Sequence, residues 1–136
     1  IGGGVMVLHP LFAYPTLILA LVVFGLQIVS ILKSRSAIRY ALYLNGLLIV
    51  FALLSVVFGF GVSNVPLVQS KVPFIWGFPH KWNGILLFIF SVLNFIVFWF
   101  KGEGVGRKMV LLPAIGLLIT LFQLFTGWML RLVFFS

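Results

Sequence analysis

The chain has 136 residues, of which 63% are hydrophobic, 17% are aromatic and only 7% are charged. A soluble domain of this length does not bury so much apolar surface, so the composition predicts an integral membrane protein of one compact domain. The formal net charge of +8 comes from basic residues scattered singly near predicted helix ends, which argues against nucleic-acid binding and predicts contact with lipid headgroups.

Four segments are apolar and long enough to cross a hydrocarbon core, which takes about 20 helical residues. They cover residues 10–32, 38–61, 82–100 and 109–134. Residues 1–5 before the first of them are too few for a signal peptide. Because residues 33–37 and 101–108 form short connections, we expect an all-α, antiparallel four-helix transmembrane bundle with up-down-up-down topology. Prolines and aromatic residues in the longer connection, residues 62–81, indicate a structured lid at the headgroup level.

Basic residues are unequally divided between the two ends of the predicted bundle. The short connections carry six of them: Lys33, Arg35, Arg39, Lys101, Arg107 and Lys108. The other end carries three: Lys71, Lys81 and Arg131. This asymmetry predicts a multi-pass protein of the cell membrane with cytoplasmic short loops and with both termini outside.

Small and polar residues recur at helical spacing along one face of each span. These stripes predict the bundle interior, because lipid-facing positions favour large apolar side chains. The stripes are His9, Ala13, Thr16, Ala20, Val23 and Gln27; Asn45, Ala52, Ser55 and Gly59; His80, Gly84, Leu87, Ser91 and Asn94; and Gly116, Thr120, Gln123, Gly127 and Arg131.

The two histidines, His9 and His80, precede the first and third spans, which run in the same direction. In an antiparallel bundle these spans are diagonal partners, so both imidazoles lie at one depth. Two such imidazoles suit axial ligation of a haem iron. The chain has no Cys and a single acidic residue, Glu103, so it offers no other pair of strong metal ligands. The absence of paired carboxylates also argues against acid–base hydrolysis.

Residues near the predicted outer end complete the expected haem site. Gly59, Gly84 and Gly127 would leave room for a flat macrocycle, although glycines also serve close helix packing. Lys71, Lys81 and Arg131 would neutralise the propionates, and Trp82 would pack on the porphyrin edge.

The sequence therefore predicts a b-type haem-binding subunit for electron transfer in a respiratory complex, more plausibly an accessory subunit of a membrane oxidoreductase than an enzyme itself. It would hold one haem b in the outer half of the bundle. Its partners would be membrane lipid and either other membrane subunits or an extracytoplasmic redox partner. Two alternatives stay open. One is a haem-free scaffolding subunit of a larger complex, and the other is a quinone-binding anchor in which His80 and Trp82 contact the headgroup.

Three short motifs resemble those of small four-helix membrane proteins in domain-of-unknown-function family 2231. Residues 9–15 (HPLFAYP) are similar to the opening of that family, residues 79–83 (PHKWN) to the start of its third span, and residues 126–128 (TGW) to a motif in its last span. The resemblance implies a four-helix fold, and the family's two histidines suggest haem binding. The acidic-aromatic element that ends the family pattern is absent here, where Arg131 stands close by. A looser similarity to membrane cytochromes b implies haem as well, although those often hold two.

Overall fold

The computed structural model describes the backbone of residues 2–63 and 74–135. It describes the side chains of residues 11–34, 36–60, 79–102, 104–130 and 132. This part of the chain forms four long helices, α1 (Gly2–Leu32), α2 (Ile38–Ser63), α4 (Phe74–Lys101) and α5 (Leu111–Phe135). Three short 3-10 helices lie in the connections, η1 (Arg35–Ala37), η2 (Gly102–Gly104) and η3 (Arg107–Val110), and no strand occurs among the described residues.

Each of the four spans predicted from the sequence corresponds to a helix long and apolar enough to cross a membrane. These stretches are Leu11–Leu32, Ile38–Phe60, Pro79–Lys101 and Arg107–Leu130, with 22 to 24 residues each. At 1.5 Å per residue such a stretch covers roughly 33–36 Å, slightly more than the hydrocarbon thickness of a bilayer. The predictions of an all-α fold and of four helices long and apolar enough to span a membrane are confirmed for the described residues.

Helices α1 and α4 begin earlier than the spans drawn from the sequence. The first starts at Gly2 instead of residue 10, and the second starts at Phe74 instead of residue 82. Residues 74–81 are therefore helical, although they were assigned to the long connection. Hydropathy marks where a helix meets lipid, whereas helical hydrogen bonding continues past that boundary. Pro79, one turn into α4, lacks the backbone N–H for one of these bonds.

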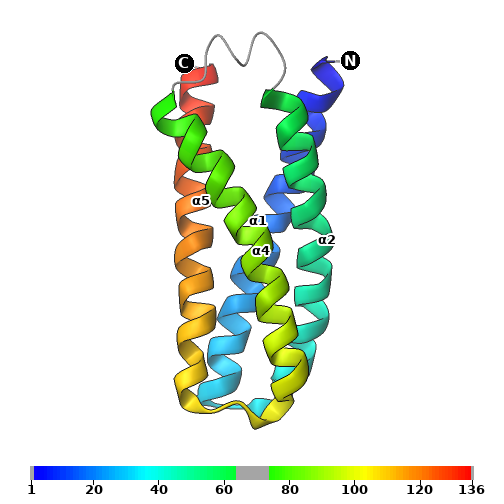
Figure 1. Cartoon of the computed structure of the whole chain (residues 1–136), viewed down its shortest axis with the longest axis vertical. Coiled ribbons are helices and arrows are strands. Elements are labelled where there is room, and N and C mark those ends of the chain that lie inside the picture. Colours follow the sequence, from blue (N-terminus) through cyan, green and yellow to red (C-terminus); the bar gives the residue numbers. More distant parts are fainter. Residues whose placement is uncertain (1, 64–73, 136) are drawn as a thin grey trace.

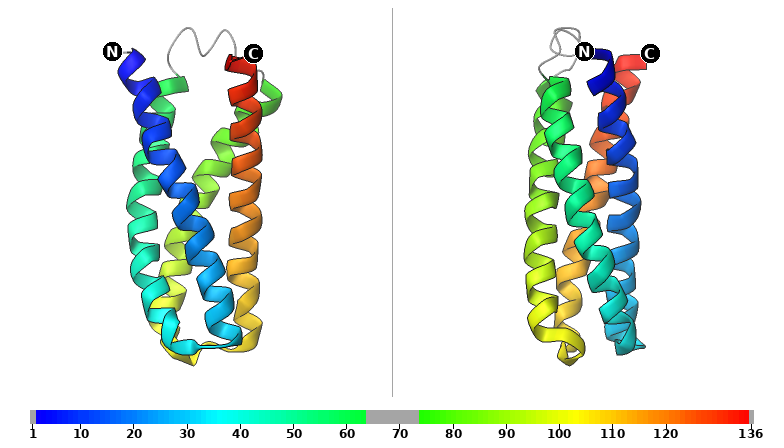
Figure 2. Two further views of the ribbon diagram at one scale, coloured as in Figure 1. Left: turned by 180° about the vertical axis from the view of Figure 1, so that it is seen from behind. Right: turned by 90° about the vertical axis from the view of Figure 1, so that its right-hand side faces the viewer.

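Successive helices run in opposite directions, as Figure 1 shows. We call the end where α1 and α4 begin the histidine end, and the end that carries η1, η2 and η3 the short-loop end. Helix α1 packs against α2 and α5, and α4 packs against the same two helices, so α1 and α4 are diagonal partners. Toward the histidine end the α1–α2 pair separates from the α4–α5 pair (Figures 1 and 2).

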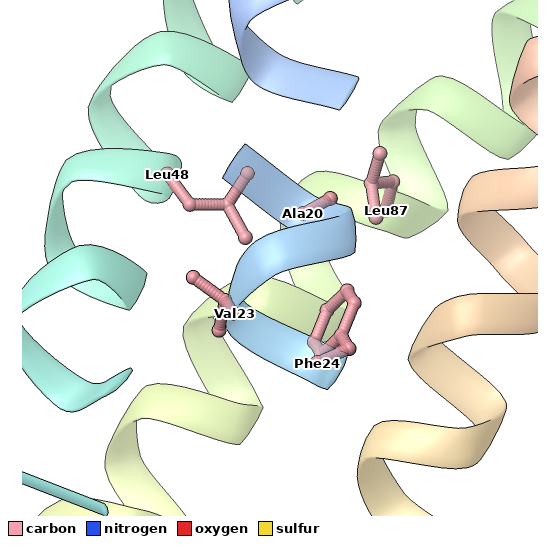
Figure 3. Packing of buried hydrophobic residues seen from close by; sticks show 5 residues of the cluster. All are labelled: Ala20, Val23, Phe24, Leu48 and Leu87. Atoms are coloured by element: carbon pink, nitrogen blue, oxygen red, sulfur yellow. The ribbon is translucent and has the colours of Figure 1, made fainter. Parts of the chain in front are cut away.

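Two apolar clusters form the core. The central cluster joins three helices through Ala20, Val23, Phe24, Leu48 and Leu87 (Figure 3). The second cluster lies nearer the short-loop end and contains Ile31, Ile38, Leu42, Phe98 and Val105. Because the surface around these clusters is also apolar, packing and lipid contact are served by different faces of the same helices.

The described residues of the small and polar stripes are buried or half-buried, as the helical spacing predicts. The fully or nearly buried polar side chains are Thr16, Gln27, Ser30, Asn45, Ser91, Asn94, Thr120 and Thr126. Large apolar side chains on the opposite faces, such as Ile18, Leu53 and Leu118, are about half exposed or more and are available to lipid. Burial of the polar residues follows from the cost of placing an amide or hydroxyl group in hydrocarbon.

Candidate functional site

His80 lies near the start of α4 and faces α5. Its Nδ1 atom is 2.9 Å from the hydroxyl oxygen of Thr126, and its Nε2 atom is 3.5 Å from the side-chain nitrogen of Gln123. The ring is half-buried, so it points into the bundle as the stripe on the third span predicts.

A second polar side chain of α4, Asn83, joins the same group one turn further along. Its amide nitrogen donates to the backbone carbonyl of Ile119 and to Oε1 of Gln123, both at 2.9 Å. We refer to His80, Asn83, Gln123 and Thr126 as the histidine cluster. The four bonds between helices described above connect α4 to α5.

The hydrogen bonds of the histidine cluster select one tautomer of His80. A carbonyl only accepts, so Ile119 fixes Asn83 as a donor, and Gln123 must then accept through Oε1. The remaining amide group of Gln123 is a donor and faces Nε2 of His80, so Nε2 carries the lone pair. The proton is thus on Nδ1, which donates to the Thr126 hydroxyl, and that hydroxyl donates to the carbonyl of Gln123 at 3.2 Å.

Two glycines from the predicted site permit this close approach of α4 and α5. A Cβ atom at Gly127 would lie 3.1 Å from Cε1 of His80, and one at Gly84 would lie 2.9 Å from the amide nitrogen of Gln123. Both positions are therefore filled by side chains of the histidine cluster. Gly59 is half-buried on α2, in the neighbouring helix pair.

The cationic and aromatic residues of the predicted site lie on the bundle surface where they are described. The Lys81 ammonium is 4.8 Å from the ring centroid of Phe60 and 5.8 Å from that of Trp82. Trp82 is 52% exposed. Such cation–π contacts are typical of side chains that anchor a helix at the headgroup level. They also link α4 to α2 at the histidine end.

Three predicted site residues lie partly or wholly outside the described part of the chain. His9 belongs to the helical backbone of α1 and Arg131 to that of α5, but the side chains of both are outside the described residues, and so is all of Lys71. The diagonal arrangement of α1 and α4 carries both histidines at the same end of the bundle. Among the described side chains, no three metal-binding residues of the His, Cys, Asp or Glu type come together.

The sequence reasoning named His80 but did not assign Asn83, Gln123 or Thr126 to the site. The signal was present in the spacing. Asn83 follows His80 by three residues, and Thr126 follows Gln123 by three, so each pair shares a helix face. What the spacing did not supply was the rotation of α4 against α5, which brings the two faces together.

A further polar layer lies between the two apolar clusters. The Asn94 amide nitrogen is 2.9 Å from Oε1 of Gln27, which joins α4 to α1, and the Asn45 amide nitrogen donates to the Ser91 carbonyl at 3.1 Å, which joins α2 to α4. We call Gln27, Asn45, Ser91 and Asn94 the amide layer. The central apolar cluster separates it from the histidine cluster.

Comparison of the chain with protein-family models, with curated proteins and with solved structures found no match, so the site is interpreted from its own geometry.

Proposed function

We propose that the chain is a b-type haem-binding membrane subunit for electron transfer, with His80 as one axial ligand and His9 as the other. The observation that carries the proposal is the tautomer of His80. A haem-ligating histidine presents one unprotonated ring nitrogen and usually donates its other N–H to a fixed acceptor. His80 has this arrangement, because Thr126 accepts from Nδ1 and the lone pair is on Nε2.

The position of the two histidines supports the same proposal. Helices α1 and α4 are diagonal, and the two helix pairs separate toward the histidine end (Figure 2). Haem binding between the pairs requires Gln123 to give up its 3.5 Å contact with Nε2. That contact is at the long limit of a hydrogen bond and is longer than the other bonds of the histidine cluster.

Charge at the histidine end supports a group with anionic propionates. Lys81 is exposed at this level, and Lys71 and Arg131 complete the set of basic residues that the sequence places there. The propionates would be oriented by these cations, while the apolar helix faces would exclude water from the macrocycle.

When bound, haem supplies one-electron chemistry, and the chain fixes where electrons enter. Both histidines are at one end of the bundle, and the apolar cluster around Phe24 and Leu87 lies between that end and the amide layer. One haem at this site does not bridge the membrane. We infer exchange with a quinol or an extracytoplasmic redox partner, with the short loops in the cytoplasm as the basic residues indicate.

The test is a reduced-minus-oxidised absorption spectrum of the chain purified in detergent. A b-type signal is expected, and His80→Ala and His9→Ala should each abolish or strongly shift it. Tyr43→Phe is the matched control, because Tyr43 is an exposed residue near the start of α2, at the short-loop end and away from the histidine cluster. Colourless wild-type protein, or an unchanged signal in His80→Ala, would contradict the proposal.

A second candidate function is a quinone-binding anchor. The observation that favours it is the convergence of an imidazole with two side-chain amides, those of Asn83 and Gln123, because such groups hydrogen-bond quinone carbonyls. Two results together would favour this function over haem binding: a colourless wild-type protein whose lipid extract contains quinone, and a His80→Ala protein whose extract does not.

A further inference from the structure

The amide layer contains three side chains that are fully buried and only partly bonded. Gln27 of α1, Asn45 of α2 and Asn94 of α4 are each 0% exposed. Within the described residues, three of their polar atoms have no hydrogen-bond partner: Nε2 of Gln27, Oδ1 of Asn45 and Oδ1 of Asn94. Unbonded buried amide atoms are rare and costly in proteins, so an additional bound molecule that forms hydrogen bonds with them is expected.

The numbers of donors and acceptors in this set do not depend on how the amides are oriented. Asn45 donates to the carbonyl of Ser91, which fixes its oxygen as the unpaired atom. The Gln27–Asn94 pair can be reversed only as a pair, because reversing one amide alone would place two nitrogens or two oxygens together. Either arrangement of the pair leaves one donor and one acceptor. The layer therefore needs a ligand that donates to two oxygens and accepts from one N–H.

The neighbouring hydroxyl groups do not meet this need. Ser30 and Ser91 donate to carbonyls of their own helices, those of Leu26 and Leu87, at 2.6 and 2.7 Å. The layer is also closed toward both ends of the bundle by apolar residues, with Phe24 and Leu48 on one side and Ile31, Leu42 and Phe98 on the other.

We propose that the amide layer binds one water molecule between α1, α2 and α4. Water accepts the N–H of Gln27 and donates its two protons to the oxygens of Asn45 and Asn94, which satisfies all three atoms. A metal cation is disfavoured by the N–H that faces the site, and an anion by the two carbonyl oxygens. The three atoms belong to one layer because Gln27 bonds Asn94 directly, and Asn45 bonds Ser91, one turn from Asn94 on α4.

The bound water joins three helices at a level where the apolar clusters supply no directional contacts. It fixes the rotation of α1 and α2 relative to α4 on the short-loop side of the region where the two helix pairs separate. This role is independent of haem, because the central apolar cluster lies between the amide layer and the histidine cluster.

The test is a nuclear Overhauser measurement between the water resonance and the side-chain amide protons of the full chain in nanodiscs. Cross-peaks of a long-lived water are expected at the amide of Gln27, or of Asn94 if the pair is reversed. Loss of these cross-peaks is expected in Asn45→Leu. The matched control, Asn83→Leu, removes an amide from the histidine cluster and should leave them unchanged.

Wild-type protein alone decides the result if a variant does not fold. An amide–amide cross-peak between Gln27 and Asn94 without any cross-peak to water would overturn the proposal. So would amide shifts in this layer that depend on sodium when sodium chloride replaces choline chloride at constant ionic strength, because a cation would then occupy the site. Because haem is not involved, a colourless protein leaves this test intact.

Discussion

Asn83 of α4 donates to Oε1 of Gln123 of α5 at 2.9 Å, and this bond determines the tautomer of a third residue, His80. With the oxygen of Gln123 engaged, only its amide N–H faces Nε2 of His80. The lone pair of the imidazole is thereby assigned to Nε2 by residues that do not themselves titrate.

Replacing the acceptor of the His80 N–H should weaken haem binding. Thr126→Val keeps the shape of the side chain but removes the oxygen that accepts from Nδ1 at 2.9 Å. Loss of such a supporting bond typically lowers metal affinity by about 10- to 100-fold. Haem titration of the apoprotein, followed by absorbance, measures the change. Thr16→Val is the control, because the Thr16 hydroxyl donates to the carbonyl of Phe12 in its own helix. Equal affinities of the two variants would contradict the assigned role of Thr126.

Substitution of Gly116 by alanine should destabilise the bundle. A Cβ atom there would lie 2.7–2.8 Å from three ring atoms of Phe24, a fully buried side chain of the central cluster. Overpacking of this kind costs about 1–3 kcal/mol, because a rigid ring has no free space to enter.

Gly25→Ala is the matched control, since nothing lies within 4 Å of its new Cβ atom. It should leave stability unchanged or raise it by up to about 1 kcal/mol through helix propensity. Thermal unfolding in detergent, followed by circular dichroism, distinguishes the two variants. A Gly116→Ala protein as stable as Gly25→Ala would show that α1 and α5 are not packed this closely.

The bond between Gln27 and Asn94 predicts energetic coupling between α1 and α4. In a double-mutant cycle with Gln27→Leu and Asn94→Leu, the two effects should not add, because the second substitution removes a group already left without its partner. Side-chain hydrogen bonds between membrane helices contribute about 0.5–2 kcal/mol, which is the coupling expected from equilibrium unfolding in mixed micelles. Gln27→Leu combined with Tyr43→Leu, at an exposed site, serves as the additive reference. Additivity in both cycles would refute the bond.

The unequal distribution of basic residues predicts the orientation of the chain in the membrane. The chain has no cysteine, so single cysteines can be introduced without background labelling. A membrane-impermeant maleimide should label Ser70→Cys in intact cells but Ser36→Cys only after permeabilisation, because the short loops carry more positive charge. The reverse pattern would place the histidine end in the cytoplasm and move the proposed redox partner to that side.

Apolar length and helical spacing were sufficient to predict the four helices and their inward faces. Gln27, Asn45, Ser91 and Asn94 were all assigned to interior stripes and are all buried. This success has a simple cause, since hydrocarbon excludes backbone and side-chain polar groups at every position of a span. The start of α2 was predicted at residue 38, but those of α1 and α4 were not. In α4, residues 74–81 lie before the apolar stretch, so their helical bonding leaves no mark in hydropathy.

The sequence by itself determined that the chain has four helices long and apolar enough to span a membrane and that both histidines belong to the same end of the bundle. Only the tertiary structure decided which side chains meet across helices, such as Asn83 with Gln123 and Gln27 with Asn94. The physical reason is that periodicity specifies the face of one helix, whereas a hydrogen bond between two helices depends on their relative rotation and height. Those are set by the packing of all four helices together.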